Sequence, residues 1–261
     1  MAQRELRRDW RSQGERQLGR VIDNAPAVRI ADPQDGEPDL DPIQIDLSRF
    51  ERNPISRAAD RALKRLVDVL LAATVLALTA PLLIVIWMTI RLSSPGPVIF
   101  RHRRIGSKGK YFDCYKFRTM VHDADQLLES VLSKNPSLRA EFEETHKLKD
   151  DPRVTRIGEI LRKTSLDEFP QFWNVLKGDM SIVGPRPIVT EEVEKYGRWL
   201  PVILAVRPGI TGLWQVSGRN DTTYAERIAL DRRYVLTRTI AADLSIMAKT
   251  PTVMVKRNGA Y

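Results

Sequence analysis

The sequence predicts an α+β protein that is mainly helical: a re-entrant (monotopic) membrane helix, then a small cytosolic domain with short strands and interfacial amphipathic helices. The first observation is an apolar run from Leu66 to Ile90, about 25 residues and roughly 37 Å long as a helix. The second is a pair of strand-like segments around Gly106 and Gly109. The third is the helical spacing of apolar residues in much of the remaining chain.

The apolar run has basic residues at both ends and Pro81 inside it. Lys and Arg beside a membrane segment tend to stay cytoplasmic, so a simple span would carry one basic cluster across the bilayer. A bend at Pro81 leaves arms of roughly 22 and 15 Å, and neither crosses a hydrocarbon core of roughly 30 Å. We therefore expect a helix that enters one leaflet and returns. A kinked single-pass anchor is the alternative.

Composition divides the chain into three parts. Residues 1–55 are expected to be a disordered tail, first basic and then acidic, residues 56–92 the membrane helix, and residues 93–261 the cytosolic domain. The chain has 42 Lys and Arg against 33 Asp and Glu, which favours anionic partners such as phosphates and lipid headgroups. No recognised module supports nucleic-acid binding. The single cysteine allows no internal disulfide.

The elements after the membrane helix are predicted from turns and periodicity. They are a hairpin from VIFRHRRIG and KYFDCYKFRTM, a helical stretch over residues 122–149, helices at 158–161 and 169–176, a strand-like ITGLWQVSG at 210–218, and a helical end at 224–255 broken near Pro251.

Asp167 and Glu168 form the first candidate for chemistry. Adjacent helical residues point about 100° apart, so the two carboxylates suit different roles. An aspartate can attack phosphorus and form an acyl phosphate, while the other carboxylate holds Mg²⁺ together with phosphate oxygens. The alternative is structural, because Ser165 and Glu168 match the S-x-x-E pattern of a capping box at a helix start.

Basic residues form the second candidate. Arginine forks match phosphate oxygens, and neighbouring Pro and Gly hold the backbone in place. For any single arginine, a surface or salt-bridge role is the alternative. The arginines beside rigid turns or the acidic pair are Arg153, Arg162, Arg186 and Arg207.

Lys116 and Arg118 follow the membrane helix, where a lipid phosphate would meet them if the helix returns to the interface. General anchoring to headgroups is the alternative. The sequence has no P-loop, no dinucleotide-binding motif and no zinc-protease motif, and its histidines lack ligand-like spacing.

Several segments together carry a family resemblance: KRLVDVLLAATVLALTAPLLI, RHRRIG, YKFRTM, DPRVTRIGEILRKTSLDEFPQFWNVLKGDMSIVGPRP and RPGITGLWQVSGRND. Over residues 62–261 the chain resembles the bacterial sugar transferases, which are monotopic polyprenyl-phosphate glycosyl-1-phosphate transferases. It is most similar to exopolysaccharide-priming galactose- or glucose-1-phosphate transferases.

The resemblance implies transfer of a sugar-1-phosphate from a UDP-sugar to undecaprenyl phosphate at the cytoplasmic face of the bacterial inner membrane, with release of UMP. It implies Asp167 as nucleophile, Glu168 as Mg²⁺ ligand, and Arg162 as a phosphate-binding residue. A capping role for Ser165 and Glu168 can coexist with catalysis.

The resemblance also places Lys116, Arg186 and Arg207 in the active site and the helix break at Pro81. The chain departs from the family at that break, with Ala80-Pro81 where Ser-Pro is common, so other groups would hold the bend. A non-catalytic membrane adaptor of a polysaccharide assembly is the rival function. The sugar and the oligomeric state stay open.

Overall fold

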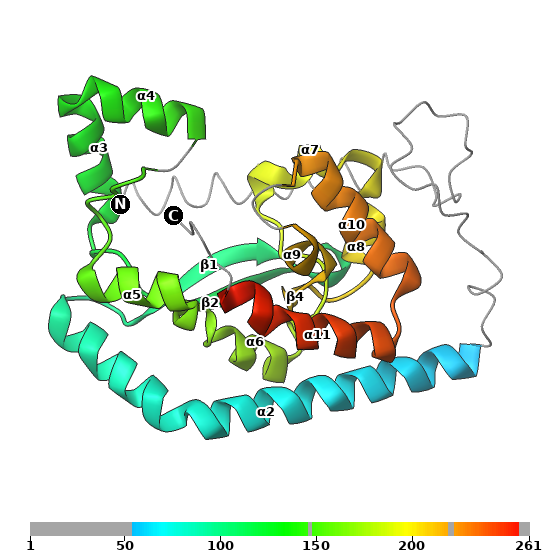
Figure 1. Ribbon diagram of the computed structural model, residues 1–261. Helices are drawn as coiled ribbons and strands as arrows, with labels where there is room; N and C mark the ends of the chain where they lie inside the picture. Colours follow the sequence, from blue (N-terminus) through cyan, green and yellow to red (C-terminus); the bar gives the residue numbers. More distant parts are fainter. Residues whose placement is uncertain (1–53, 146–147, 219–221, 256–261) are drawn as a thin grey trace.

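The computed structural model describes residues 54–145, 148–218 and 222–255 (Figure 1). The expected tail, residues 1–55, lies outside this part except for its last two residues. The described chain is mainly helical, with two separate two-stranded sheets. This confirms the predicted class of fold.

One long helix, α2 (Pro54–Ser93), runs along the base of the molecule (Figure 1). It is continuous through Pro81, and its axis changes direction along its length. The Thr79 hydroxyl donates to the Val75 carbonyl at 2.7 Å, a side-chain bond that bends helices. A hydroxyl close to Pro81 is therefore present although Ser is missing from the Ala80-Pro81 pair.

Both flanks of the apolar run are attached to the same domain. Near the start, Lys64 pairs with Asp243 at 2.9 Å and Arg65 donates to the Val175 carbonyl at 2.6 Å. After the end, Arg118 donates to the carbonyls of Ser94 at 2.8 Å and Pro95 at 2.6 Å. The helix therefore lies against the domain at both ends.

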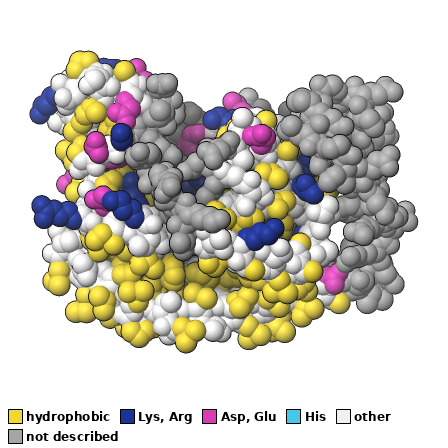
Figure 2. Space-filling view, in the orientation of Figure 1, with side chains coloured by type: hydrophobic (Ala, Val, Ile, Leu, Met, Phe, Trp, Pro, Cys, Tyr) yellow, Lys and Arg dark blue, Asp and Glu magenta, His cyan; other side chains and the backbone are white. Residues whose placement is uncertain are grey.

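Between these attachments α2 exposes a broad apolar face, which forms the lower surface in Figure 2. Leu78 is 77% exposed and Leu92 is 84% exposed. By length and composition, the segment Ala59–Ser93 is long and apolar enough to cross a membrane. An exposed apolar face of this extent is a surface that a membrane or another protein would cover.

The predicted hairpin is present. Strand β1 (Ile99–Ile105) pairs antiparallel with β2 (Tyr111–Phe117), and the 3₁₀ turn η2 (Ser107–Gly109) joins them. His102 lies opposite Cys114, so side chains at alternate positions of both strands share one face.

The helical stretch predicted over residues 122–149 is two helices, α3 (Ala124–Lys134) and α4 (Pro136–Thr145). The break comes at Asn135, because a residue before proline is excluded from helical conformation. Helix α5 (Arg156–Thr164), the turn η3 (Leu166–Glu168) and helix α6 (Gln171–Lys177) follow, where helices were predicted.

Two predictions in the last third of the chain were wrong. The strand-like ITGLWQVSG forms only β4 (Gly209–Thr211) before helix α9 (Leu213–Ser217). The final helical region breaks between α10 (Tyr224–Thr237) and α11 (Ile240–Val255), and Pro251 lies inside α11. The short elements between α6 and β4 are β3 (Ser181–Val183), η4 (Thr190–Glu192), α7 (Val193–Tyr196), η5 (Gly197–Trp199) and α8 (Leu200–Leu204).

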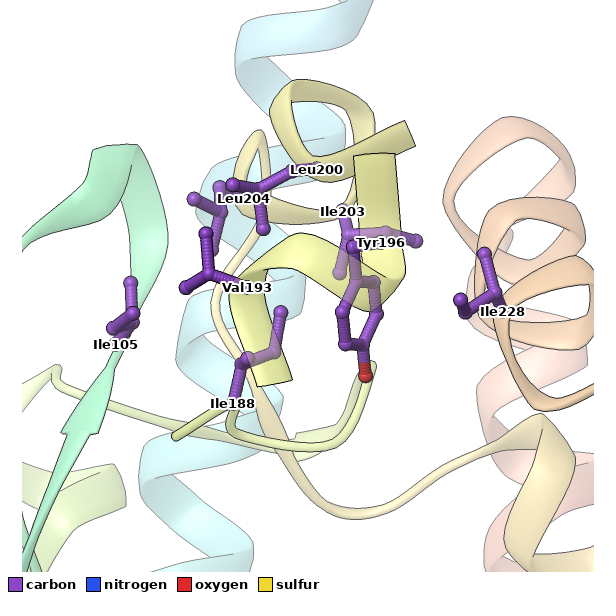
Figure 3. Packing of buried hydrophobic residues seen from close by; sticks show 8 residues of the cluster. All are labelled: Ile105, Ile188, Val193, Tyr196, Leu200, Ile203, Leu204 and Ile228. Carbon is purple, nitrogen blue, oxygen red and sulfur yellow. The ribbon is translucent and has the colours of Figure 1, made fainter. Parts of the chain in front are cut away.

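Strand β3 pairs parallel with β4 at the centre of the domain. The apolar core lies on either side of it. One cluster packs Ile105 from the end of β1 against residues of α7, α8 and α10, and Figure 3 shows these side chains converging. A second cluster packs α6, β3, α10 and α11 against Ala72 of α2.

Asn174 joins α6 to the hairpin. Its amide pairs with the outer edge of β2, accepting from the Tyr115 main-chain N–H at 2.9 Å and donating to the Asp113 carbonyl at 2.7 Å. The Asn174 side chain is fully buried. Because α6 begins shortly after η3, this pairing also sets where η3 lies against β2.

We expect Asn174→Ala to destabilise the protein, because it leaves two partly buried main-chain groups of β2 without their partners. The free energy of unfolding should fall by about 3 kcal/mol, since each unpaired group costs about 1–3 kcal/mol. Thermal unfolding in detergent measures it. Asn135→Ala is the control, because Asn135 bonds the Val131 carbonyl at an exposed helix end. Equal melting temperatures for the two variants would contradict the assigned role of Asn174.

Candidate active site

Asp167 and Glu168 lie on η3, the tight turn between α5 and α6. Helix α5 ends at Ser165, whose φ of 58° is left-handed, and the chain then turns toward β2. Ser165 caps the end of α5, and its side chain makes no capping bond to η3. The predicted capping box of Ser165 and Glu168 is therefore wrong, because the left-handed residue precedes a single 3₁₀ turn instead of a helix.

Lys116 of β2 faces this turn. Its Nζ lies 2.7 Å from Glu168 Oε1, and both side chains are partly exposed. The ion pair joins two predicted site residues that are 52 positions apart in sequence.

Asp167 is mostly shielded from solvent. Burial raises the pKa of its carboxyl from 3.8 to about 6, with Glu168 adding to the rise, while Lys116 and Arg162 oppose it. Because the pKa stays below neutral, Asp167 is ionised at pH 7 and is poorly solvated. A poorly solvated carboxylate between cations is suited to nucleophilic attack on a phosphate ester.

Arg162 approaches Asp167 from the last turn of α5. Its Nε donates to Thr119 Oγ1 at 3.0 Å, and burial lowers the pKa of its guanidinium. Gly158 allows this close approach, since a Cβ there would lie 2.0 Å from the Thr119 carbonyl oxygen. The glycine thus lets α5 bring Arg162 against the end of β2.

The hairpin adds two residues that the sequence reasoning did not select, His102 and Arg104. Arg104 donates to the Pro187 carbonyl at 3.1 Å and to His102 Nδ1 at 3.2 Å. Burial and the charges of Arg104, Lys116 and Arg186 lower the pKa of His102 to about 4, so the ring is neutral and Nδ1 accepts. Alternation along β1 places both residues on the face of Lys116, and this pattern was a signal for them.

Arg186, in the turn after β3, lies beside Arg104. Burial lowers the pKa of Arg104, and the positive charge of Arg186 lowers it further. We call Lys116, Arg104, Arg162 and Arg186 the basic cradle. Of these four, Lys116 forms an ion pair with Glu168 at 2.7 Å, and Arg162 lies in the field of the Asp151 and Asp167 carboxylates. Buried like charges are costly without an anion nearby, so the cradle is suited to bind one.

Three predicted phosphate ligands lie elsewhere. The Arg118 guanidinium is buried and bonded to the turn at Ser94 and Pro95, which differs from the expected contact with a lipid phosphate. Arg153 forms a forked pair with Asp151, with a shortest distance of 2.7 Å.

Arg207 also lies outside the cradle. Its Nε donates to the Gly178 carbonyl at 2.8 Å, beyond the end of α6 that is farther from η3. In each of the three cases the rigid turn supplies carbonyl or carboxylate partners for the guanidinium, and these partners place the side chain.

The carboxylates fit Mg²⁺ only together with a substrate. No group of three or more His, Cys, Asp or Glu is gathered as a metal site within residues 54–145, 148–218 and 222–255. Mg²⁺ in phosphate sites commonly takes one or two carboxylates plus phosphate oxygens and water. Glu168 and Asp167 supply such a donor set, and Glu168 also forms an ion pair with Lys116.

The family profile of bacterial sugar transferases matches residues 59–257. The chain belongs to the bacterial sugar transferase family. It is 46% identical over 218 residues to the undecaprenyl-phosphate galactose phosphotransferase of Salmonella typhimurium, covering 84% of this chain and 45% of that protein. The chain thus spans less than half the length of this relative.

Two relatives of similar length match as well. The exopolysaccharide production protein ExoY of Rhizobium meliloti is 47% identical over 198 residues, 76% of this chain and 88% of that protein. The UDP-glucose:undecaprenyl-phosphate glucose-1-phosphate transferase of Caulobacter vibrioides is 39% identical over 231 residues, 85% of this chain and 81% of that protein.

We expect Asp167→Asn to be at least as stable as the wild type at pH values well above 6. A folded pKa of about 6 against an ordinary 3.8 means that ionised Asp167 lowers the free energy of unfolding. This penalty grows between the two values and is constant above 6, so the difference in melting temperature should shrink toward about pH 4.

Melting curves at several pH values measure this difference. Asp150→Asn, at an exposed position, is the control, and it should change the melting temperature little. A strongly destabilised Asp167→Asn would contradict the assigned electrostatics.

Proposed function

We propose that the chain transfers a hexose-1-phosphate, of galactose or glucose, from a UDP-hexose to undecaprenyl phosphate. UMP is released, and the reaction is the first membrane step of exopolysaccharide synthesis. The observation that carries the proposal is the partly desolvated Asp167 between Lys116 and Arg162, with Glu168 beside it. Membership of the family and the reactions named for the Salmonella and Caulobacter relatives support it.

The reaction proceeds in two steps. An Asp167 carboxylate oxygen attacks the phosphorus that bears the sugar, and the bond from that phosphorus to the bridging oxygen breaks, which releases UMP. A phosphate oxygen of the lipid then attacks the same phosphorus and displaces Asp167. One phosphoanhydride bond is lost and one is gained, so the overall reaction is close to reversible.

The basic cradle and Glu168 stabilise the charges of this reaction. Lys116, Arg162 and Arg186 neutralise the donor diphosphate, and Arg104 joins them. Glu168, with Asp167 nearby, would hold Mg²⁺, whose charge would make the leaving phosphate more stable. Lys116 already donates to Glu168 Oε1, so a positive charge lies beside Glu168 whether or not Mg²⁺ is bound.

The position of α2 supports a re-entrant helix. Lys64 and Arg65 at one flank and the turn at Ser94 and Pro95 at the other are all bonded to the same domain. A single-pass helix would place these flanks on opposite sides of the bilayer. Basic residues at both flanks support a position of the domain on the cytoplasmic face of the inner membrane, the side on which a UDP-hexose is dissolved.

We expect Asp167→Asn to abolish turnover because it removes the attacking oxygen's charge. UMP release from a UDP-hexose with undecaprenyl phosphate in detergent should fall by at least about 10³-fold, as when a catalytic nucleophile is lost. Asp150→Asn should retain wild-type rates. A radiolabelled hexose phosphate on the wild-type protein would show the intermediate, and substantial turnover by Asp167→Asn would refute the nucleophile. Folded wild type that releases no UMP would favour a non-catalytic adaptor.

Arg104→Gln should weaken use of the donor because the cradle loses a buried cation. We expect the KM for the UDP-hexose to rise by at least about tenfold, or about 1.4 kcal/mol. Arg103→Gln is the matched control, since Arg103 points to the other face of β1 and its guanidinium lies 4.7 Å from the Tyr111 ring centre. Equal kinetic effects in the two variants would show that Arg104 is only structural.

A further inference from the structure

Beside the basic cradle lies a group of buried polar atoms without hydrogen-bond partners. Among the residues that the structure describes, the side-chain atoms that lack a partner of good hydrogen-bond geometry form one set, which we call the α9–α10 cluster: Arg186 Nε, Trp214 Nε1, Gln215 Oε1, Arg227 Nε, both carboxylate oxygens of Asp231, and Tyr224 OH, which interacts only with Tyr196. Each costs about 1–3 kcal/mol when it stays unpaired, and folded proteins contain few of them. Their concentration in one place calls for a ligand-based explanation.

Two helices and one turn build the cluster. Trp214 and Gln215 come from α9, and Arg186 comes from the turn after β3. Tyr224, Arg227 and Asp231 are spaced three and four residues apart, which places them on one face of α10. The cluster is therefore a property of the fold instead of a local sequence run.

Its cations and rings are in direct contact. The Arg227 guanidinium lies 4.4 Å from the Trp214 ring centre and 5.5 Å from that of Tyr224. The Arg186 guanidinium lies 5.9 Å from the Trp214 ring centre. These contacts leave the arginine Nε atoms and the indole N–H inside the cluster.

Asp231 is its most buried member, with no exposed surface. Burial raises the pKa of its carboxyl to about 8, while the nearby Arg186 main-chain N–H and the charges of Arg227 and Arg186 oppose the rise. Neither oxygen accepts a hydrogen bond of acceptable geometry. A buried carboxyl group in this position is stabilised by any further donor that reaches it beyond the Arg186 main-chain N–H.

The unpaired atoms of the cluster are complementary to a ligand whose hydrogen-bond donors and acceptors lie on neighbouring atoms. Arg186, Trp214 and Arg227 offer N–H donors, whereas Asp231 and Gln215 offer acceptors. A sugar hydroxyl both donates and accepts, and a hexose carries several on adjacent carbons. A nucleobase would instead stack on an aromatic face, but guanidinium groups already lie over the Trp214 ring.

We propose that the α9–α10 cluster binds the hexose hydroxyls of the donor and selects which hexose is transferred. This inference rests on the proposed function. Arg186 belongs both to the cluster and to the basic cradle, so the sugar pocket adjoins the phosphate site. In the donor the hexose is one oxygen away from the attacked phosphorus, which matches adjacent sites. Arg186, Gln215, Tyr224 and Arg227 are only partly buried, so the rim of the cluster is open to solvent.

The test separates the hexose from the nucleotide. Binding of UDP-galactose, UDP-glucose and UMP to the purified full chain is measured by isothermal titration calorimetry for wild type, Arg227→Gln, Trp214→Phe and Asp231→Asn. We expect the variants to bind the preferred UDP-hexose at least about tenfold more weakly and to discriminate less between the two hexoses. UMP binding should be unchanged.

Arg232→Gln is the matched control. Arg232 lies on the same helix, 4.3 Å from the Trp199 ring centre, and belongs to neither the cluster nor the cradle. Its affinities for all three ligands should equal those of the wild type. Melting temperatures identify any variant that fails to fold. Trp214→Phe removes the indole N–H together with part of a buried ring, so the same loss in Arg227→Gln and Asp231→Asn is required to assign it to the hexose.

Three results would overturn the inference. Equal weakening of UMP and UDP-hexose binding would assign the cluster to the nucleotide. Unchanged UDP-hexose binding in the folded variants would make it purely structural. A wild type that binds UMP and UDP-hexoses equally would leave no role for the hexose. UMP release by the wild type is measured in a separate assay. A failure of the proposed reaction is therefore distinguished from a failure of the proposed hexose site.

Discussion

The position of the active site depends on one buried amide. Asn174 pairs with the open edge of β2, and its main-chain carbonyl accepts the N–H groups of Gly178, Asp179 and Met180 beyond the end of α6. The side chain of this one residue joins α6 to the hairpin, and its main-chain carbonyl closes the turn that leads from α6 into β3. Since η3 immediately precedes α6, the distance between Lys116 and Glu168 follows from this joint.

The site holds buried charges whose mutual repulsion and lost hydration a bound substrate can offset. Arg186 lies close enough to Arg104 to disfavour the charge of the Arg104 guanidinium, and Asp167 is ionised at the cost of its hydration. The packing of the hairpin, α5 and the turn after β3 maintains this arrangement. A diphosphate would meet cations that are already oriented, so little reorganisation is needed when charge moves in the reaction.

The sequence predicted the features that depend on neighbouring residues along the chain. The apolar run, the hairpin and the helices around η3 follow from periodicity and turn residues. The resemblance selected Lys116, Asp167 and Glu168, and the structure brings them together. Arg118 and Arg153 remain predicted phosphate ligands, and in the structure their guanidiniums bond to the Pro95 carbonyl and the Asp151 carboxylate, contacts that no sequence spacing reveals.

Other features depend on contacts between distant segments. Arg104 was missed because its role comes from Arg186, which is far away in sequence. ITGLWQVSG reads as a strand, yet only Gly209–Thr211 finds a partner, and Trp214 turns into the core on a helix. The capping pattern at Ser165 was overridden by the left-handed end of α5. In each case tertiary packing outweighed a weak local preference.

The double attachment of α2 has a thermodynamic consequence. Asp68 of this helix accepts bonds from the Ser181 hydroxyl and the Ile182 main-chain N–H, so the helix supplies part of the central sheet's polar network. Ala72 fills the adjoining core. Pulling α2 away from the domain would therefore open the interior of the domain, so detachment of the helix and unfolding become a single cooperative event.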